Sequence, residues 1–395
     1  MTARLRVLVL GGAEGQLACI AACRRIDADV VLVDPRAGVP GIALADQWIT
    51  LDVMQTEAIV HALEGQAVDA VLTDQSDYAA RAAAALAVAL GLPGQELDVV
   101  EACSNKLVMR QRLTNTVPDL VPWFRHENDS DAARAFIAEQ NAPVIVKPLQ
   151  SQGSRGVSFV NTSADFPLLD EAFAESDGKG VLIEQAVAGT EYSVDGFVRG
   201  GVLTPLAISA KTHYDANPCL DERCDFLPSM FTEVEASLLN AMHRIVEALR
   251  IDTGIVHAEL IVGDHGVTLV EIALRGGGGG ISGLIVPYLT GFEPAEALLR
   301  HWLQLPDLPA PRDFHDRAAS LRFLPYTPPA DINEPDSDIP GWLSLVRSEQ
   351  RFAPGNVPRS GAERAGAIIV VGNTEDDARA AEDQAMRLLG YSLGA

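Results

Sequence analysis

Residues 144–157 read VIVKPLQSQGSRGV, and this stretch decides the fold class. Its apolar first half predicts a short strand that ends at Lys147, and the glycines and serines that follow predict a flexible loop. Glycine permits conformations that turn amide N–H groups toward an anion. A lysine at the base of such a loop favours a phosphate cover over a plain turn, although the GxxxxGK[ST] pattern of a Walker A loop is absent. The predicted phosphate ligands are Lys147, Ser151, Gly153, Ser154, Arg155 and Gly156.

Upstream of this stretch, strand and helix patterns alternate over the first 105 residues. Strands that alternate with helices form a parallel, doubly wound sheet, so we expect a Rossmann-like α/β unit over 1–105. The strands are expected at 4–10, 30–34 and 70–73, and a helix from about Ser76 to Leu90.

Downstream, the pattern changes to that of α+β units, which makes the whole chain a multidomain α/β and α+β protein. We place the unit boundaries at 106–190, 191–305 and 306–395, the last being a C-terminal α/β segment that packs on the core. Within these units we expect a linker helix at 101–113, helices at 130–140 and 233–249, an irregular stretch at 214–230, and Pro-rich linkers near 305–312 and 325–340. We expect strands at 156–160, 180–185, 191–198 and 204–210, and a final strand and acidic helix at 366–372 and 374–389.

Bulk composition excludes two kinds of partner. The chain has 30 Lys and Arg against 54 Asp and Glu, a net charge of −24, whereas proteins that bind nucleic acids gather basic side chains. The longest apolar run, residues 82–90, is far shorter than the roughly 20 residues that span a bilayer. We therefore expect neither a nucleic-acid partner nor a membrane segment.

Cysteine usage indicates a reducing compartment. The five cysteines form no CxxC pair, so we expect reduced thiols and a cytoplasmic protein. A metal or disulfide site at Cys219 and Cys224 is the alternative to a plain loop.

Two carboxylates fall on a predicted hairpin. Glu259 lies in GIVHAELIV and Glu271 in VTLVEIA, and a hairpin centred on His265 places them directly opposite one another. At about 5 Å and an effective dielectric of about 20 they would repel by roughly 3 kcal/mol. Mg²⁺ would remove that cost, because it prefers hard oxygen ligands and keeps much of its water. A solvent-exposed acidic pair without metal is the alternative.

Arg275 and five glycines follow this hairpin directly. Such a glycine density indicates close approach of a ligand or a moving loop, with a flexible linker as the alternative. Arg275 is then expected to donate its guanidinium fork to a transferring phosphate.

These features, in this order over about residues 100–300, resemble the ATP-grasp superfamily. The resemblance implies an ATP-grasp fold after the N-terminal sheet, with 106–190 as a mobile lid subdomain and 191–305 as the catalytic subdomain. It implies ATP as cofactor, with Lys106 and Lys147 on the phosphates and Glu259 and Glu271 as ligands of Mg²⁺, or alternatively Mn²⁺. IEQAVAGTEYSVD is similar to the segment that binds adenine and ribose, with Glu184 and Gln185 at the start of the hinge, Val187 against adenine and Glu191 on the ribose hydroxyls.

The sequence departs from the superfamily pattern at Ala273, where many members have an Asn metal ligand. An E-x-A-x-R version is similar to that of amino-acid ligases. The resemblance thus implies a carboxylate–amine ligase with small-molecule substrates, an acyl phosphate intermediate and an amino acid as substrate. Members are often dimers, so a homodimer is also implied.

Further side chains are candidates near the substrates. Lys211 and His213, in SAKTHYD, follow a strand, and a catalytic role is weighed against a solvated strand end. His257 shares the face of Glu259, where it either touches the metal shell or is simply packed. The substrate pockets are expected along 11–16, 73–77 and 214–230.

Three rival functions stay open. LGGAEG after the first strand and Asp34 at the end of the second suggest a dinucleotide-dependent oxidoreductase, but the first glycine of GxGxxG falls at Leu10. The turn at Gly11, Gly12 and Gly15 then has a structural role. The other rivals are a carboxylase that phosphorylates bicarbonate and an ATP-binding sensor without catalysis.

Overall fold

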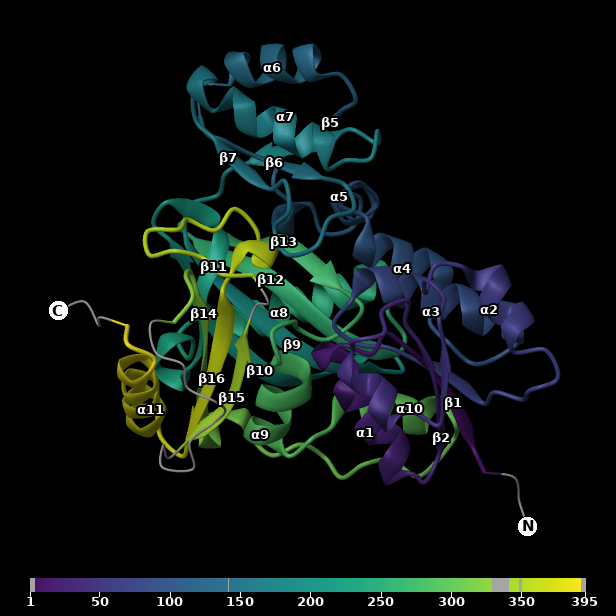
Figure 1. The fold of residues 1–395 in the computed structure, drawn as a ribbon. Helices are drawn as coiled ribbons and strands as arrows, with labels where there is room; N and C mark the ends of the chain where they lie inside the picture. Colours follow the sequence, from purple (N-terminus) through teal and green to yellow (C-terminus); the bar gives the residue numbers. More distant parts are fainter. Residues whose placement is uncertain (1–3, 141, 329–340, 348–349, 392–395) are drawn as a thin grey trace.

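The computed structural model describes residues 4–140, 142–328, 341–347 and 350–391. Three sheets organise this part of the chain (Figure 1). A small sheet with helices α6 and α7 stands above a large central sheet, and the N-terminal unit lies beside the large sheet. No helix among the described residues is long and apolar enough to cross a membrane.

The N-terminal sheet is parallel, as the alternating pattern predicts, with strand order β3-β2-β1-β4. The first strand, VLVL, is buried along both faces, which is typical of a parallel sheet covered by helices. Helix α3 begins after Ser76, whose hydroxyl accepts from Ala79 N–H, and ends at Gly91 with a φ of 66°. The elements are β1 (Arg6–Leu10), α1 (Leu17–Arg25), β2 (Asp29–Val33), β3 (Gln47–Ile49), α2 (Thr56–Ala62), β4 (Ala70–Leu72) and α3 (Asp77–Leu90).

The prediction of one linker helix over 101–113 is wrong. Two helices, α4 (Leu97–Ser104) and α5 (Lys106–Thr114), meet at Asn105, whose backbone is extended. The Asn105 side chain accepts hydrogen bonds from the N–H groups of Leu107 and Val108 and so starts a new helix. Lys106 consequently becomes the first residue of α5.

The small sheet is antiparallel, with strand order β5-β8-β6-β7. Its core is formed by apolar side chains of the strands and of two helices, among them Val144, Val146 and Ile183. The predicted strand ending near Lys147 is confirmed as β6. The elements are β5 (Phe124–Glu127), α6 (Ser130–Glu139), β6 (Val144–Pro148), β7 (Ser158–Val160), α7 (Phe166–Ala174) and β8 (Val181–Gln185).

The large sheet has eight antiparallel strands in the order β13-β12-β9-β10-β11-β14-β16-β15. Strands from beyond residue 306 therefore extend the same sheet that carries the predicted metal carboxylates. Its strands are β9 (Thr190–Arg199), β10 (Val202–Tyr214), β11 (Asn217–Phe226), β12 (Gly254–Gly263), β13 (Gly266–Ala273), β14 (Ala318–Leu324), β15 (Trp342–Arg347) and β16 (Gly366–Gly372), and its helices are α8 (Glu235–Leu249), α9 (Val286–Thr290), α10 (Pro294–Trp302) and α11 (Glu375–Leu388).

The sequence analysis missed three of these strands. The stretch 214–230 is not irregular, because β11 runs through it; three consecutive charged residues, 221–223, hide its alternation. Strands β14 and β15 were also not predicted. The Pro-rich stretch 305–312 contains no helix or strand, whereas most of the second predicted linker, 329–340, lies outside the described residues.

Candidate nucleotide and catalytic site

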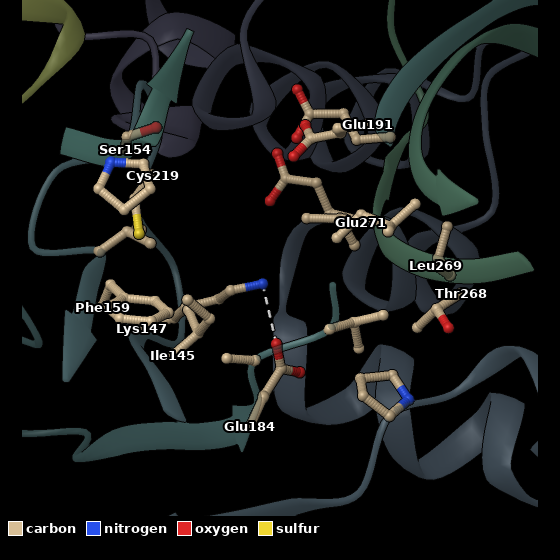
Figure 2. A pocket seen from close by; sticks show the side chains of 18 of the residues that line it. Ile145, Lys147, Ser154, Phe159, Glu184, Glu191, Cys219, Thr268, Leu269 and Glu271 are labelled. Atoms are coloured by element: carbon tan, nitrogen blue, oxygen red, sulfur yellow. Dashed lines mark ion pairs between the residues drawn. The ribbon is translucent and has the colours of Figure 1, made fainter. Parts of the chain in front are cut away.

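A cavity of about 310 Å³ lies between the small sheet and the large sheet. Figure 2 shows Lys147 reaching into it from one side, while the carboxylates of Glu191 and Glu271 point into it from another. The structure thereby gathers side chains that are far apart in the sequence. The predicted site residues that line the cavity are Lys106, Lys147, Ser151, Gly153, Ser154, Glu184, Gln185, Val187, Glu191, His213, Glu259 and Glu271.

One part of the cavity is apolar. Ile145 and Phe159 lie on the side of Lys147, and Leu269 and Thr268 lie across from them (Figure 2). Apolar walls on opposite sides suit a flat aromatic ring. Val187, which the resemblance places against adenine, lines the same cavity.

Lys147 is part of a buried ion-pair network. Its Nζ lies 2.8 Å from Glu184 Oε2, and Arg110 Nε lies 2.5 Å from the other oxygen of Glu184. Burial alone raises the pKa of Glu184, but the charges of Arg110 and Lys147 outweigh it and lower the pKa to about 2. The network therefore fixes both cations at the cavity wall.

The sequence analysis missed Arg110. It lies one turn after Lys106 on α5, so the two basic side chains share a helix face. Arg110 Nη2 also donates to the carbonyl oxygen of Val270 at 2.8 Å, which ties α5 to the hairpin of the predicted metal ligands. The spacing of four residues between Lys106 and Arg110 was the signal in the sequence that could have identified Arg110.

Glu259 and Glu271 are directly opposite on β12 and β13, as predicted. The route to this register differs from the expected one. The turn pairs Gly263 with Gly266, and a regular hairpin from that turn would place Glu259 opposite Val270. An irregularity between Glu259 and Leu260 adds one residue on β13 and restores the pair of glutamates.

Each of these glutamates is paired with a lysine. Lys106 Nζ lies 3.1 Å from Glu271 Oε2 and also donates to the carbonyl oxygen of Ser151 at 3.1 Å. Lys211 Nζ donates to Glu259 Oε1. The donor set is one of hard oxygens on adjacent strands, which fits Mg²⁺ or Mn²⁺.

Lys211 lies beneath the cavity and does not line it. Its side chain is 2% exposed, and its Nζ lies 2.9 Å from Glu191 and 3.3 Å from Asp221, in addition to Glu259. Burial alone lowers the pKa of Lys211, but the three carboxylates raise it well above its ordinary value. A charged lysine in this position organises the carboxylates and is shielded from direct contact with substrate.

His213 joins the same carboxylates at the cavity wall. Its Nε2 lies 3.3 Å from Glu191 and 3.4 Å from Asp221. Although burial alone lowers the pKa of His213, these hydrogen bonds raise it to about 10. Ligand atoms of Glu191, His213 and Asp221 lie within 4.8 Å of one another, and the protonated imidazole is itself the cation between the two carboxylates. Asp221 was missed because β11 was not recognised.

Arg275 also lies outside the main cavity. Its Nε and Nη2 are 2.8 and 3.3 Å from the two carboxylate oxygens of Asp77 on α3. The guanidinium that was expected to bind a phosphate is thus paired with a carboxylate of the N-terminal unit. Arg275 borders a small cavity beside the N-terminal unit instead.

The glycine run after Arg275 approaches protein groups. Gly276 N–H donates to Asp74 Oδ1 at 2.7 Å, and Gly277 N–H donates to Asp195 Oδ1 at 3.2 Å. A Cβ at Gly276 would collide with the hydroxyl of Ser282. Protein side chains therefore explain why glycine is needed at the first two positions. The expected close approach of a ligand is not needed to explain them.

Two predicted phosphate ligands of the loop are placed elsewhere. The Arg155 side chain is exposed and does not line the cavity. Gly156 has a φ of +69°, and a Cβ there would lie 2.9 Å from Pro148 Cγ, so this glycine is needed for the packing of the turn. Of the loop ligands predicted, Ser151, Gly153 and Ser154 line the cavity.

Other candidates have structural partners. His257 Nδ1 lies 3.0 Å from Asp195 Oδ1 and its Nε2 lies 3.8 Å from Glu259, so it is packed and borders the carboxylate pair. Cys219 and Cys224 are free thiols, and neither belongs to a metal-binding group among the described residues.

The N-terminal glycine turn is filled by protein. Asp34 accepts a hydrogen bond from Gly12 N–H at 2.9 Å and pairs with Arg36. A Cβ at Gly41 would lie 2.9 Å from Gly12 Cα, so the chain itself covers the turn. This arrangement contradicts the dinucleotide alternative, because no space is left for a pyrophosphate.

Residues 140–283 match the ATP-grasp domain family. The chain is similar to dapdiamide A synthase of Enterobacter agglomerans, with 24% identity over 80% of this chain and 77% of the relative. It is similar to phosphoribosylamine–glycine ligase of Methanopyrus kandleri, with 26% identity over 69% of this chain and 67% of the relative. Its fold resembles the crystal structure of an L-amino acid ligase from Bacillus licheniformis, with a TM-score of 0.77, 18% identity and coverage of 97% of this chain and 98% of that one.

Proposed function

We propose that this chain, an ADP-forming carbon–nitrogen ligase of the ATP-grasp superfamily, joins a carboxylate to an amine through an acyl phosphate. One observation carries the proposal: two lysines and two opposed glutamates, Lys106, Lys147, Glu259 and Glu271, line a single cavity beneath the glycine loop. Lysines alone would bind many anions, and glutamates alone would repel a triphosphate. The combination suits a triphosphate together with a divalent cation.

Each part of ATP is assigned to a different part of the cavity in this proposal. The apolar walls at Ile145, Phe159 and Leu269 would hold the base, and Glu191 would accept hydrogen bonds from the ribose hydroxyls. The phosphates would then lie toward Lys147 and Lys106, under the glycine loop.

Glu259 and Glu271 would hold Mg²⁺ or Mn²⁺. Their carboxylates are opposed across two strands and their charge is offset by Lys106 and Lys211. When bound there, the ion neutralises charge on the phosphate oxygens during transfer. With its place at Glu271 taken by the ion, Lys106 would be free to contact the phosphates.

The proposed reaction has two steps. A carboxylate oxygen of the substrate attacks the γ-phosphorus, the bond to the β–γ bridging oxygen breaks, and ADP leaves. The amine nitrogen of the second substrate then attacks the acyl carbon, the carbon–oxygen bond to phosphate breaks, and the amine loses a proton to the departing phosphate. Lys147 and Lys106 stabilise charge on the transferred group, and the loop keeps water from the acyl phosphate.

An amino acid is the proposed substrate. This part rests on the similarity to proteins named dapdiamide A synthase and L-amino acid ligase, and on Ala273 in the E-x-A-x-R sequence. The second candidate, a bicarbonate-phosphorylating carboxylase, is kept as an outcome of the test.

The test is ATP consumption with Mg²⁺ across pooled amino acids and small carboxylic acids, followed by mass spectrometry of the products. Release of ADP together with a new amide mass supports the proposal and identifies the substrates. ADP release with bicarbonate alone would show that the protein is a carboxylase instead. Tight ATP binding without turnover in any pool would favour a sensor.

A further inference from the structure

One side chain of the glycine loop, that of Gln152, contacts the start of α3 in the N-terminal unit. With its amide oxygen turned toward α3, Gln152 accepts hydrogen bonds from the backbone N–H groups of Asp77 and Tyr78, each at 2.8 Å. The next residue of the loop, Gly153, accepts a hydrogen bond from Gly361 N–H at 2.8 Å. The loop is therefore held from two sides by segments far away in the sequence.

The contact with α3 supplies hydrogen-bond acceptors that the start of this helix lacks. The first N–H groups of a helix have no partner inside it. Ser76 satisfies Ala79 N–H, which leaves Asp77 and Tyr78 to other acceptors. Gln152 supplies an acceptor to both, so the loop completes the helix cap.

The same end of α3 holds Arg275. The carboxylate of Asp77 binds the Arg275 guanidinium, while the N–H of Asp77 binds Gln152. The loop contact and the Arg275 ion pair therefore both depend on Asp77. Asp77 cannot move away from Gln152 without also disturbing the ion pair.

We propose that Gln152 is a positioning residue that couples closure of the glycine loop to Arg275 through the start of α3. An open loop leaves two N–H groups of α3 without this cap and relaxes the support of Asp77. The consequence for catalysis rests on the proposed function: the acyl phosphate is shielded from water only while this contact is made.

Hydrogen exchange of the full-length protein tests the contact without any assay of activity. In Gln152→Met, which keeps the size of the side chain but removes its acceptor, the amides of Asp77 and Tyr78 should exchange roughly three- to tenfold faster. Gln152→Glu should restore slow exchange. Gln150→Met is the matched control, because Gln150 in the same loop contacts Lys179 and Glu101 instead of α3. Unchanged exchange in Gln152→Met, or equal acceleration in Gln150→Met, would overturn the proposal.

Product analysis tests the coupling. Gln152→Met should release several phosphates for each amide formed, whereas Gln152→Glu should return the ratio toward that of the unsubstituted protein. A ratio unchanged in Gln152→Met, together with accelerated exchange, would overturn the catalytic part of the proposal. If the unsubstituted protein forms no amide in any pool, the proposed function fails, and the exchange result still decides whether Gln152 holds the loop.

Discussion

Glu259 faces Glu271 only because β13 carries one residue more than β12 between this pair and the turn. The extra residue bends the strand pair where the carboxylates must meet. Glu271→Gln should lower ATP turnover by about 100-fold or more, because it removes one of the two carboxylates proposed to hold the divalent cation that neutralises the transferred phosphate. Turnover and thermal unfolding of the variant are the measurements. A folded variant with near-normal turnover would remove the metal assignment.

Lys147→Met should weaken ATP binding by roughly 10- to 100-fold, because a charged hydrogen-bond donor is lost from the cavity wall. Calorimetric titration with ATP and Mg²⁺ measures the change. Arg155→Met is the control: its side chain is exposed and does not line the cavity, so ATP affinity should change by less than about twofold. A larger effect for Arg155 than for Lys147 would contradict the placement of the phosphates.

Asn105→Ala should lower the free energy of unfolding by about 1 kcal/mol, because it removes the acceptor that starts α5. Urea unfolding measures the loss. Asn115→Ala, at the other end of α5, removes only an exposed hydrogen bond to Gln111 and should cost less. Equal losses in the two variants would argue against a capping role.

His315 should make the stability of the protein fall as pH rises above about 6.5. Burial alone lowers the pKa of His315, but hydrogen bonds with Asp313 and Glu235 outweigh it and raise the pKa above its ordinary value near 6.5. The raised pKa stabilises the folded state fully below pH about 6.5, and the stabilisation is lost as pH rises through the folded-state value. In His315→Gln, urea unfolding at pH 6 and pH 9 should differ less than in the unsubstituted protein.

Local patterns were enough to predict much of the fold. The apolar strand before Lys147, the alternating strands and helices of the N-terminal unit, and the acidic helix after Thr374 are each encoded within a few neighbouring residues. Thr374 forms a capping box with Asp377, as the sequence pattern of a helix start requires. Such signals depend little on tertiary contacts.

The missed features depend on contacts between distant segments. The alternation of β11 is hidden by charged residues, and two of them find their partners on the neighbouring strands: Asp221 pairs with Lys211 and Glu222 with Arg322. The break at Asn105 was hidden inside a plausible helical pattern. Arg275 was expected at a phosphate, but only the folded chain brings Asp77 to its guanidinium.

The place of β14 within the large sheet sets the limits of any shortened version of this protein. β14 pairs along β11, so a chain cut near residue 305 would leave the N–H and C=O groups of β11 unpaired along one side. Such an edge can recruit strands from other molecules. A fragment that keeps every residue of the nucleotide cavity would thus tend to aggregate, so strands that line no part of this cavity protect the protein against association.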